Sequence, residues 1–182
     1  MKNLFYMLAC VSVIFLSACS SQNKKEKDDA QALTQDSVKA AGPQRMQASD
    51  VKATFKYQGK EYQSSVLRQP DESLPIVKNG QGEKFVDNRI TLRLTCGGKQ
   101  IVDKVFTKES FASLVDAKFM QYSILEGLVY DQTTPQGIIY AASVCYPQSD
   151  LYVPIRLTIT SDGKISMAKE ELMEDYQPDS VD

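Results

Sequence analysis

The chain contains no histidine and no tryptophan. Without histidine it cannot form the Ser-His or Cys-His pair of a nucleophilic enzyme, and imidazole metal sites are excluded. Without tryptophan it lacks the strongest aromatic platform for sugars, and its nine tyrosines leave only weaker ones. No motif in the chain predicts a catalytic residue, a metal site or a cofactor.

The chain also lacks an apolar run long enough to cross a membrane. Residues 4–15 are apolar and follow Lys2, but a membrane-spanning helix needs about 20 apolar residues. A basic residue followed by a short apolar run is typical of a signal peptide. We therefore expect residues 1–18 to be a signal peptide.

The four residues Leu16-Ser17-Ala18-Cys19 end this segment and resemble the lipobox of bacterial lipoproteins. The resemblance implies cleavage between Ala18 and Cys19, a diacylglyceryl thioether on the Cys19 thiol, and acylation of the new amino group. Several acyl chains anchor a protein stably, whereas one does not. By analogy with enteric bacteria, Ser20 favours transfer to the outer membrane, facing the periplasm. The alternative is an ordinary secretory signal in which the cysteine is incidental.

The chain has no excess of positive charge. It carries 21 Lys and Arg against 23 Asp and Glu, and loss of Lys2 with the signal peptide would leave 20 against 23, a net charge of -3. Binding to nucleic acid needs a basic surface, so nucleic acid is not expected as a partner. No polybasic patch is present to attract the chain to anionic lipid, so the lipid on Cys19 is expected to be the membrane contact.

The composition divides the chain into four parts. After the signal peptide, residues 19–50 contain the lipidated cysteine and a segment with no aromatic residue and few large apolar ones, which predicts a flexible tether with a reach of about 30 Å. Residues 51–169 are the right length for one domain. Residues 170–182 form an acidic tail.

The 51–169 segment alternates apolar and polar residues, which predicts a mainly β, β-rich α+β domain. We expect an antiparallel meander of about eight strands, arranged as a curved sheet, a sandwich or an open barrel. One inserted helix is expected at residues 108–120, after Thr107 as N-cap. Pro154 predicts an edge or a bulge in its strand. The expected strands are residues 53–57, 61–67, 88–96, 100–106, 123–130, 137–146, 152–160 and 164–168.

Several segments of this domain resemble a family of Bacteroidetes lipoproteins that is classed as a domain of unknown function. The similarity covers nearly all of residues 51–169 and implies a compartment and a fold, but the family carries no assigned activity. The segments are Arg68-Gln69-Pro70, Leu74-Pro75, Asp87-Asn88, Phe106-Thr107-Lys108, Leu125-Glu126-Gly127-Leu128 and Tyr146-Pro147-Gln148.

Enzymatic activity is not expected. Glu126, between Leu125 and Leu128, is the one candidate for a carboxylic acid in an apolar setting, and a pairing with Arg89 or Arg93 across the sheet explains it more simply. A serine-lysine hydrolase would need a serine near a lysine, but none of the candidates stands in a recognisable motif. Those candidates are Ser64, Ser65, Ser110 and Ser166.

Cys96 and Cys145 are the two cysteines of the domain. One interpretation is a disulfide, which an oxidising compartment permits and which would stabilise the fold by roughly 4 kcal/mol. The other is two separate buried thiols, because strand alternation places Cys96 on an apolar face. Two cysteines alone do not complete a metal site.

Two surfaces are candidates for binding. Residues 69–88 form a long connection, and such connections are usually functional or disordered; its apolar residues predict that it packs down in part, as a short extra strand. The second surface consists of arginines in or beside strands, namely Arg68, Arg89, Arg93 and Arg156. A concave face would bind an anion through these guanidinium groups, whereas a convex face would leave them solvated.

Two functional hypotheses follow. The first is a non-catalytic, lipid-anchored interaction module of the cell envelope that binds an unknown envelope protein or polymer, with an exposed edge or loop and no deep pocket. The alternative is a binding protein for a small anionic or apolar ligand, held in a cavity rimmed by arginines and tyrosines.

The lipid anchor is testable at one residue. Cys19→Ala removes the acyl acceptor, so we expect unprocessed precursor and no incorporation of labelled fatty acid, measured by the mass of the protein in membranes. Unchanged processing and labelling would contradict the lipoprotein interpretation.

Overall fold

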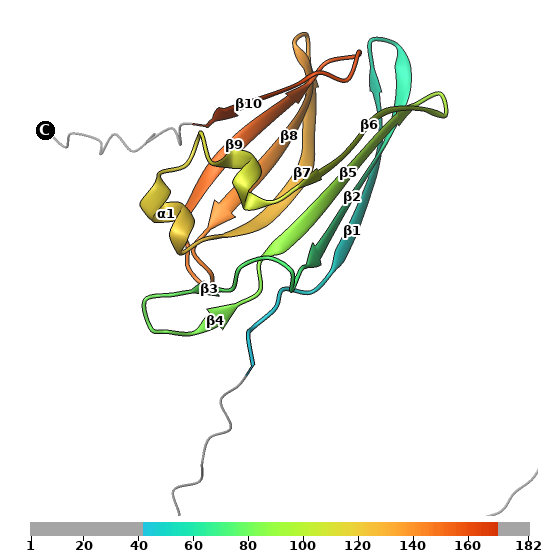
Figure 1. Cartoon of the computed structure of the whole chain (residues 1–182). Coiled ribbons are helices and arrows are strands. Elements are labelled where there is room, and N and C mark those ends of the chain that lie inside the picture. Colours follow the sequence, from blue (N-terminus) through green and yellow to red (C-terminus); the bar gives the residue numbers. More distant parts are fainter. Residues whose placement is uncertain (1–41, 171–182) are drawn as a thin grey trace, which may run out of the picture. The chain divides into compact units, whose positions relative to one another are not determined.

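A computed structural model describes residues 42–170 of the chain (Figure 1). The predicted signal peptide, Cys19, most of the predicted tether and the tail after Glu170 lie outside these residues. The elements are β1 (Ser49–Tyr57), β2 (Lys60–Pro70), β3 (Val77–Lys78), β4 (Lys84–Phe85), β5 (Asn88–Cys96), β6 (Lys99–Phe106), the 3₁₀ helix η1 (Lys108–Phe111), α1 (Ala117–Gln121), β7 (Ile124–Thr134), β8 (Gly137–Cys145), β9 (Tyr152–Ile159) and β10 (Ile165–Lys169).

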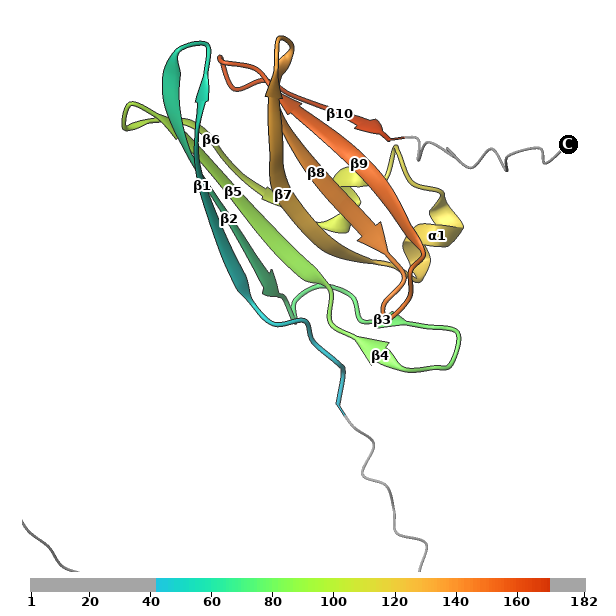
Figure 2. The same cartoon turned by 180° about the vertical axis from the view of Figure 1, so that it is seen from behind.

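Two four-stranded antiparallel sheets face each other (Figures 1 and 2). The first sheet has the strand order β1-β2-β5-β6, and the second has the order β10-β9-β8-β7. The second sheet is a meander of sequential hairpins. In the first sheet the connection from β2 to its neighbour β5 contains β3 and β4, which pair as a separate small hairpin at one end. The predicted strand-rich antiparallel meander is confirmed. Of the three expected arrangements the structure has the sandwich, and its described strands do not close into a barrel.

Two of the hairpins turn at two-residue loops with left-handed backbone. Gln58 and Gly59 have φ of 51° and 73°, and Gly97 and Gly98 have φ of 55° and 78°. Positive φ at both central residues is the requirement of the turn that matches the twist of an antiparallel hairpin. Both turns lie in the gaps between expected strands, at residues 58–60 and 97–99.

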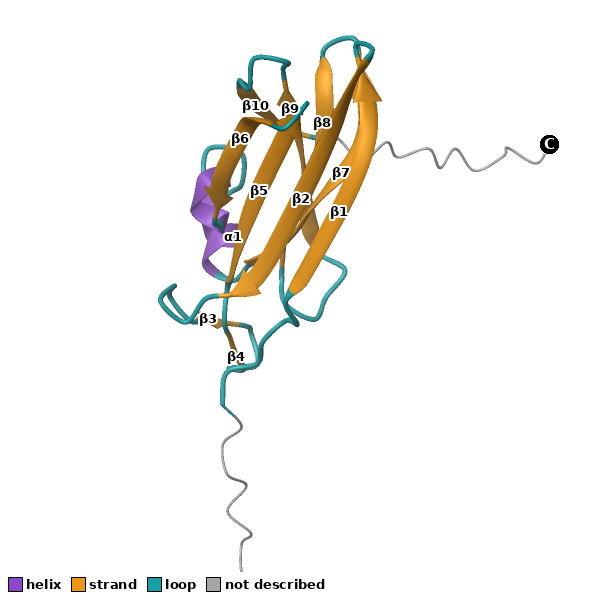
Figure 3. Cartoon of the chain, turned by 90° about the vertical axis from the view of Figure 1, so that its right-hand side faces the viewer, coloured by secondary structure: helices purple, strands orange, loops and turns teal. Residues whose placement is uncertain are grey.

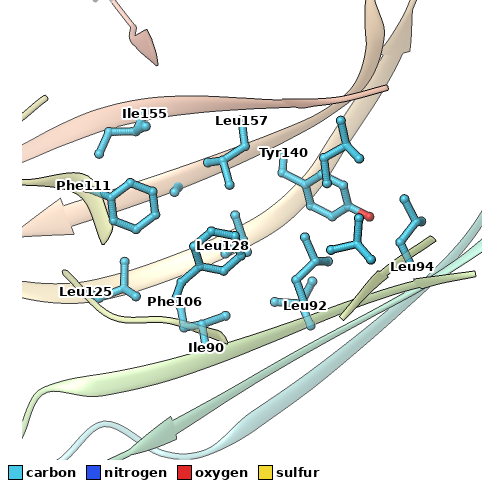
Figure 4. Packing of buried hydrophobic residues seen from close by; sticks show 14 of the residues in the cluster. Ile90, Leu92, Leu94, Phe106, Phe111, Leu125, Leu128, Tyr140, Ile155 and Leu157 are labelled. Carbon is cyan, nitrogen blue, oxygen red and sulfur yellow. The ribbon is translucent and has the colours of Figure 1, made fainter. Parts of the chain in front are cut away.

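The space between the sheets is filled by side chains (Figure 4). Apolar residues at alternate positions of each strand point inward, because successive side chains of a strand lie on opposite faces. Tyr140 crosses the interior and donates a hydrogen bond to Ser64 Oγ at 2.8 Å; its burial raises the pKa of this phenol to about 12. Fully buried members of the core include Ile90, Leu92, Leu94, Phe106, Phe111, Leu125, Tyr140, Ile155 and Leu157.

The single helix predicted for residues 108–120 is wrong in its extent. The segment forms η1 and, after several turn residues, the short helix α1. The Asp116 side chain accepts hydrogen bonds from the Lys118 and Phe119 N–H groups at 2.9 and 3.2 Å and so starts a new helix inside the predicted one. The helical segment lies on the β6 side of the sandwich (Figure 3), where Phe111 and Val115 join the core. Within residues 42–170, no helix is long and apolar enough to cross a membrane.

Pro154 does not mark an edge strand. β9 lies between β8 and β10, and its pairing with β8 shows no register shift at this residue. The proline is tolerated because the pairing of β9 with β10 ends at Ile155, so that Pro154 lies just outside the paired residues. Beyond that point the Pro154 carbonyl accepts one hydrogen bond from Glu170 N–H at 3.0 Å, so no continuous ladder is broken there.

The long connection of residues 69–88 packs down as predicted, through the β3–β4 hairpin. Gln44 forms a parallel bridge with Phe85, in which Gln44 N–H donates to the Lys84 carbonyl at 2.8 Å and Val86 N–H donates to the Gln44 carbonyl at 2.9 Å. Met46 packs on the same hairpin. The packed domain therefore begins near Gln44, earlier than the predicted boundary at residue 51.

Cys96 and Cys145 are both free, so the disulfide interpretation is wrong and that of two separate thiols holds. Cys145 is the last residue of β8 and pairs with Ile124. This end of β8 lies near Asn88, at the start of β5. Cys96 is at the other end of β5, eight residues and about 26 Å along the strand. A disulfide needs Cα atoms within about 7 Å.

A glycine substitution tests how closely the two sheets approach. A Cβ on Gly163, in the β9–β10 turn, would lie 2.6 Å from the Ile101 carbonyl oxygen of β6, and its φ is +84°. We expect Gly163→Ala to lower the free energy of unfolding by about 2 to 4 kcal/mol, from left-handed strain and overpacking together.

Gly98→Ala is the matched control, because Gly98 has a similar φ of +78° but open space around it. Gly98→Ala should lower the free energy of unfolding by about 1 to 2 kcal/mol, from the left-handed strain alone. Equal losses for the two variants in urea titrations would contradict this contact between the sheets.

Candidate binding surfaces

The predicted arginine surface does not exist as one surface. Arg89 and Arg93 point outward from the first sheet, Arg156 points outward from the second sheet, and Arg68 lies between them. The three outward guanidinium groups each have a separate acidic partner: the pairs are Arg89–Asp71 at 2.6 Å, Arg93–Asp103 at 3.2 Å and Arg156–Glu170. These are exposed, paired side chains of small energetic weight, and they do not converge on an anion.

Arg68 joins the two sheets. Its guanidinium group donates to the Glu126 carbonyl of β7 at 2.8 Å and to the Gln47 carbonyl at 3.2 Å. Its Nε is buried with no hydrogen-bond partner. Both of its described acceptors belong to the backbone, so the side chain is a structural link.

A second link between the sheets is buried almost completely. The Asp87 carboxylate accepts hydrogen bonds from Asn88 N–H at 2.7 Å and from Leu125 N–H at 2.8 Å. Asn88 Nδ2 donates to the Leu125 carbonyl at 2.9 Å. Both backbone groups of Leu125 are thus held by neighbouring side chains of the first sheet. We call this set, with Lys108 and Ser123, the buried junction.

Lys108 brings a positive charge into the buried junction. Its ammonium group donates to the Ser123 carbonyl at 2.8 Å and to the Met120 carbonyl at 3.0 Å, and lies 3.7 Å from Asp87 Oδ2. Burial raises the pKa of Asp87 above its ordinary value, while the hydrogen bonds from Leu125 and Asn88 and the Lys108 charge act to lower it. The charges are held inside the fold, away from any ligand.

The enzymatic candidates are engaged in structural contacts. Glu126 lies at a bulge in β7 and accepts a hydrogen bond from Ser143 Oγ at 3.1 Å, so its expected pairing with Arg89 or Arg93 is wrong: those arginines lie on the far face of the first sheet. Burial and the nearby Glu126 carboxylate raise the pKa of the Cys145 thiol to about 12. No group of three or more acidic or cysteine side chains within residues 42–170 is placed to hold a metal ion.

The outer face of the second sheet carries an open groove of about 660 Å³, which we call the sheet groove. Its floor consists of small and apolar side chains from adjacent strands, and exposed Val129 and Tyr152 stand at its sides. The corresponding face of the first sheet is lined by charged and hydroxyl side chains, among them Lys52, Thr54, Ser65 and Arg93. Residues of the sheet groove include Gly127, Val129, Ala141, Ser143, Tyr152, Pro154, Arg156 and Ala168.

A second hollow of about 610 Å³ lies between the tip of the β3–β4 hairpin and the β8–β9 loop; we call it the loop cleft. Its aromatic wall consists of Tyr146, which stacks on Phe119 with ring centres 4.3 Å apart, and Tyr122, which stands at 81° to Tyr146. The opposite wall carries amides and a carboxylate. The lining residues are Asn79, Gly80, Gln81, Glu83, Tyr122, Tyr146, Pro147, Gln148, Ser149 and Leu151.

The pattern of a family described as a domain of unknown function, DUF4738, matches residues 28–167. This match covers well over half of the 182-residue chain. The chain belongs to the DUF4738 family. A search of curated proteins returned no significant match.

The DUF4738 match spans the buried junction, the loop cleft and all of the sheet groove except its last residues, 168–170. Sequence analysis of this DUF4738 chain found the 69–88 connection and the run starting at Tyr146, which form opposite walls of the loop cleft. It missed Tyr122 and the open groove on the outer face of the second sheet. Tyr122 lies in the short link between the predicted helix and the next predicted strand, where no pattern marks it, and the small residues of the sheet groove look like ordinary alternation until the partner strands are known.

The buried junction predicts a large cost for removing its charge. Lys108→Met leaves Asp87 buried without its counter-charge and removes the donor to the Ser123 carbonyl, so the free energy of unfolding should fall by about 3 kcal/mol. Urea titration of the full chain measures this.

Lys118→Met is the matched control, because Lys118 is exposed on α1 and should change stability by less than about 0.5 kcal/mol. The double variant Lys108→Met, Asp87→Asn should lose less than the sum of its single variants, since both act on one network. Additive losses would contradict the coupling.

Proposed function

We propose that this DUF4738 protein is a lipid-anchored, non-catalytic interaction module of the cell envelope. In this proposal Cys19 carries the lipid, the protein faces the periplasm from the outer membrane, and the sheet groove binds an envelope protein. The anchor is supported by the lipobox at Leu16-Ser17-Ala18-Cys19. The packed domain begins near Gln44, which leaves residues 20–43 as the tether.

The observation that carries the proposal is the apolar character of the sheet groove. An antiparallel sheet with one face on the core usually turns a polar face to water, as the first sheet does. The first sheet exposes Val105 among charged and hydroxyl side chains, whereas the second sheet exposes Val129 to 47% and Tyr152 to 45% around a groove floored by small side chains, which leave room for a partner. Exposed apolar patches bordered by polar residues mark interaction sites. The Arg156–Glu170 pair supplies such a polar border.

The structural contacts of the reactive side chains support a non-catalytic role. Asp87 and Lys108 hold the buried junction, Ser64 accepts a hydrogen bond from Tyr140, and Glu126 accepts one from Ser143. None of these contacts joins a serine hydroxyl to a lysine amine, the pair that a serine-lysine hydrolase would need. The alternative of an enclosed ligand cavity has less support, because side chains fill the space between the sheets of the described domain.

A photo-crosslinking experiment tests the sheet groove. A photoreactive phenylalanine analogue placed at Tyr152 in intact cells should give a discrete adduct with one envelope protein. Val129→Asp should reduce the yield of that adduct about tenfold, because a carboxylate would be desolvated in an apolar contact.

Val105 provides the control, since it is equally exposed, at 46%, on the outer face of the first sheet. Val105→Asp should leave the adduct unchanged, and the analogue placed at Val105 should give none. Absence of any adduct at Tyr152, or equal loss in both aspartate variants, would sink the proposal.

A further inference from the structure

The loop cleft has a composition different from that of the sheet groove. Besides its tyrosines, the cleft is lined by side chains that carry amides, a hydroxyl and one carboxylate, namely Asn79, Gln81 and Glu83 from the β3–β4 hairpin and Gln148 and Ser149 from the β8–β9 loop. None of its lining residues is lysine or arginine. Its volume of about 610 Å³ lies in the range of sites that bind small molecules or short oligomers.

The missing cations exclude a ligand recognised by its negative charge, because phosphate and carboxylate groups are bound chiefly by arginine and lysine. A purely apolar ligand is also a poor fit. It would desolvate the Gln81 amide, which has no side-chain hydrogen bond within the described domain, and the Glu83 carboxylate, at a cost for each group.

A peptide added as an extra strand needs free backbone groups at an edge, and most backbone N–H groups around the cleft are already bonded. Asn79 N–H donates to the Glu83 carbonyl and Tyr146 N–H donates to the Leu151 carbonyl. Recognition must then come mainly from side chains. The other N–H groups engaged within the domain are those of Gln81, Glu83, Tyr122, Ser149 and Leu151.

The polar wall is held in place before any ligand arrives. Gln148 Nε2 donates to Gln44 Oε1 at 2.6 Å, and Asn79 Nδ2 donates to Glu83 Oε2 at 2.6 Å. Gln148 has a φ of +59°, a left-handed conformation that non-glycine residues rarely adopt. The hairpin tip, the first packed residues and the β8–β9 loop are thereby tied together, which lowers the ordering cost of binding.

We propose that the loop cleft binds an uncharged saccharide. A sugar ring has an apolar C–H face that packs on an aromatic ring such as Tyr122, which is 37% exposed. Its hydroxyl groups both donate and accept, which matches side-chain amides that do the same. Gln81 is the amide best placed to act, because it is exposed and its side chain has no hydrogen bond within the described domain. The proposal is independent of the partner at the sheet groove.

The test uses the full-length protein in detergent micelles. It is applied to an array of four-unit oligosaccharides of neutral hexoses and N-acetylhexosamines, with carboxylated and sulfated counterparts alongside, and the neutral compound that binds best is titrated by calorimetry. Tyr122→Ala should lower its association constant about tenfold, and Gln81→Ala should lower it severalfold.

Matched controls exist for both variants. Tyr152→Ala removes a tyrosine of similar exposure from the sheet groove, and Gln63→Ala removes an exposed amide from the first sheet; each should change the association constant by less than about twofold. Three results would overturn the proposal: no neutral oligosaccharide binds, charged oligosaccharides bind equally well, or the Tyr122 and Tyr152 variants lose the same affinity. Occupation of the cleft by a proline-rich peptide, with no saccharide bound, would overturn it as well. If the photoreactive analogue at Tyr152 still formed its adduct with an envelope protein in that case, the saccharide proposal would be wrong and the proposed function would be unaffected.

Discussion

The sandwich depends on the buried junction, where Asp87 and Asn88 hold the backbone of Leu125. The two sheets are separate, so apolar contact alone leaves the sheets free to slide, because hydrophobic attraction has no direction. Hydrogen bonds to both backbone groups of Leu125 set one relative position of β5 and β7. An imperfect alignment would leave a buried carboxylate and a buried ammonium group unsatisfied. Lys108 holds the end of the helical segment to the buried junction in the same way, because its ammonium group donates to the Ser123 carbonyl.

This constraint positions the candidate surfaces at the same end of the domain. β7 pairs with β8, and β8 leads into the loop that carries Leu151 and Tyr152. Leu151 lines the loop cleft and Tyr152 lines the sheet groove, so one loop borders two surfaces of different chemistry. The first packed residues, around Gln44, lie beside the same loop.

The segments by which the chain resembles a family of unknown function gather at two places in the fold. Asp87-Asn88, Lys108 and Leu125-Glu126 form or adjoin the buried junction, and Tyr146-Pro147-Gln148 forms one wall of the loop cleft. The first group is explained by folding alone, because each member satisfies a buried polar partner. The second group satisfies no such need and lies at a hollow. A functional interpretation therefore rests more securely on the β8–β9 loop than on the buried charges.

The sequence by itself determined the strand class, the positions of most strands and the two-residue turns, because alternation and left-handed turn residues are local properties. It also determined that histidine chemistry is impossible. Only the tertiary structure decided that Cys96 and Cys145 lie at opposite ends, that the arginines do not converge, and that the outer face of the second sheet carries an open groove with a floor of small and apolar side chains. Each of these depends on which distant strands pair and which faces remain uncovered. Local pattern does not carry that information, because the same alternation suits either face of either sheet.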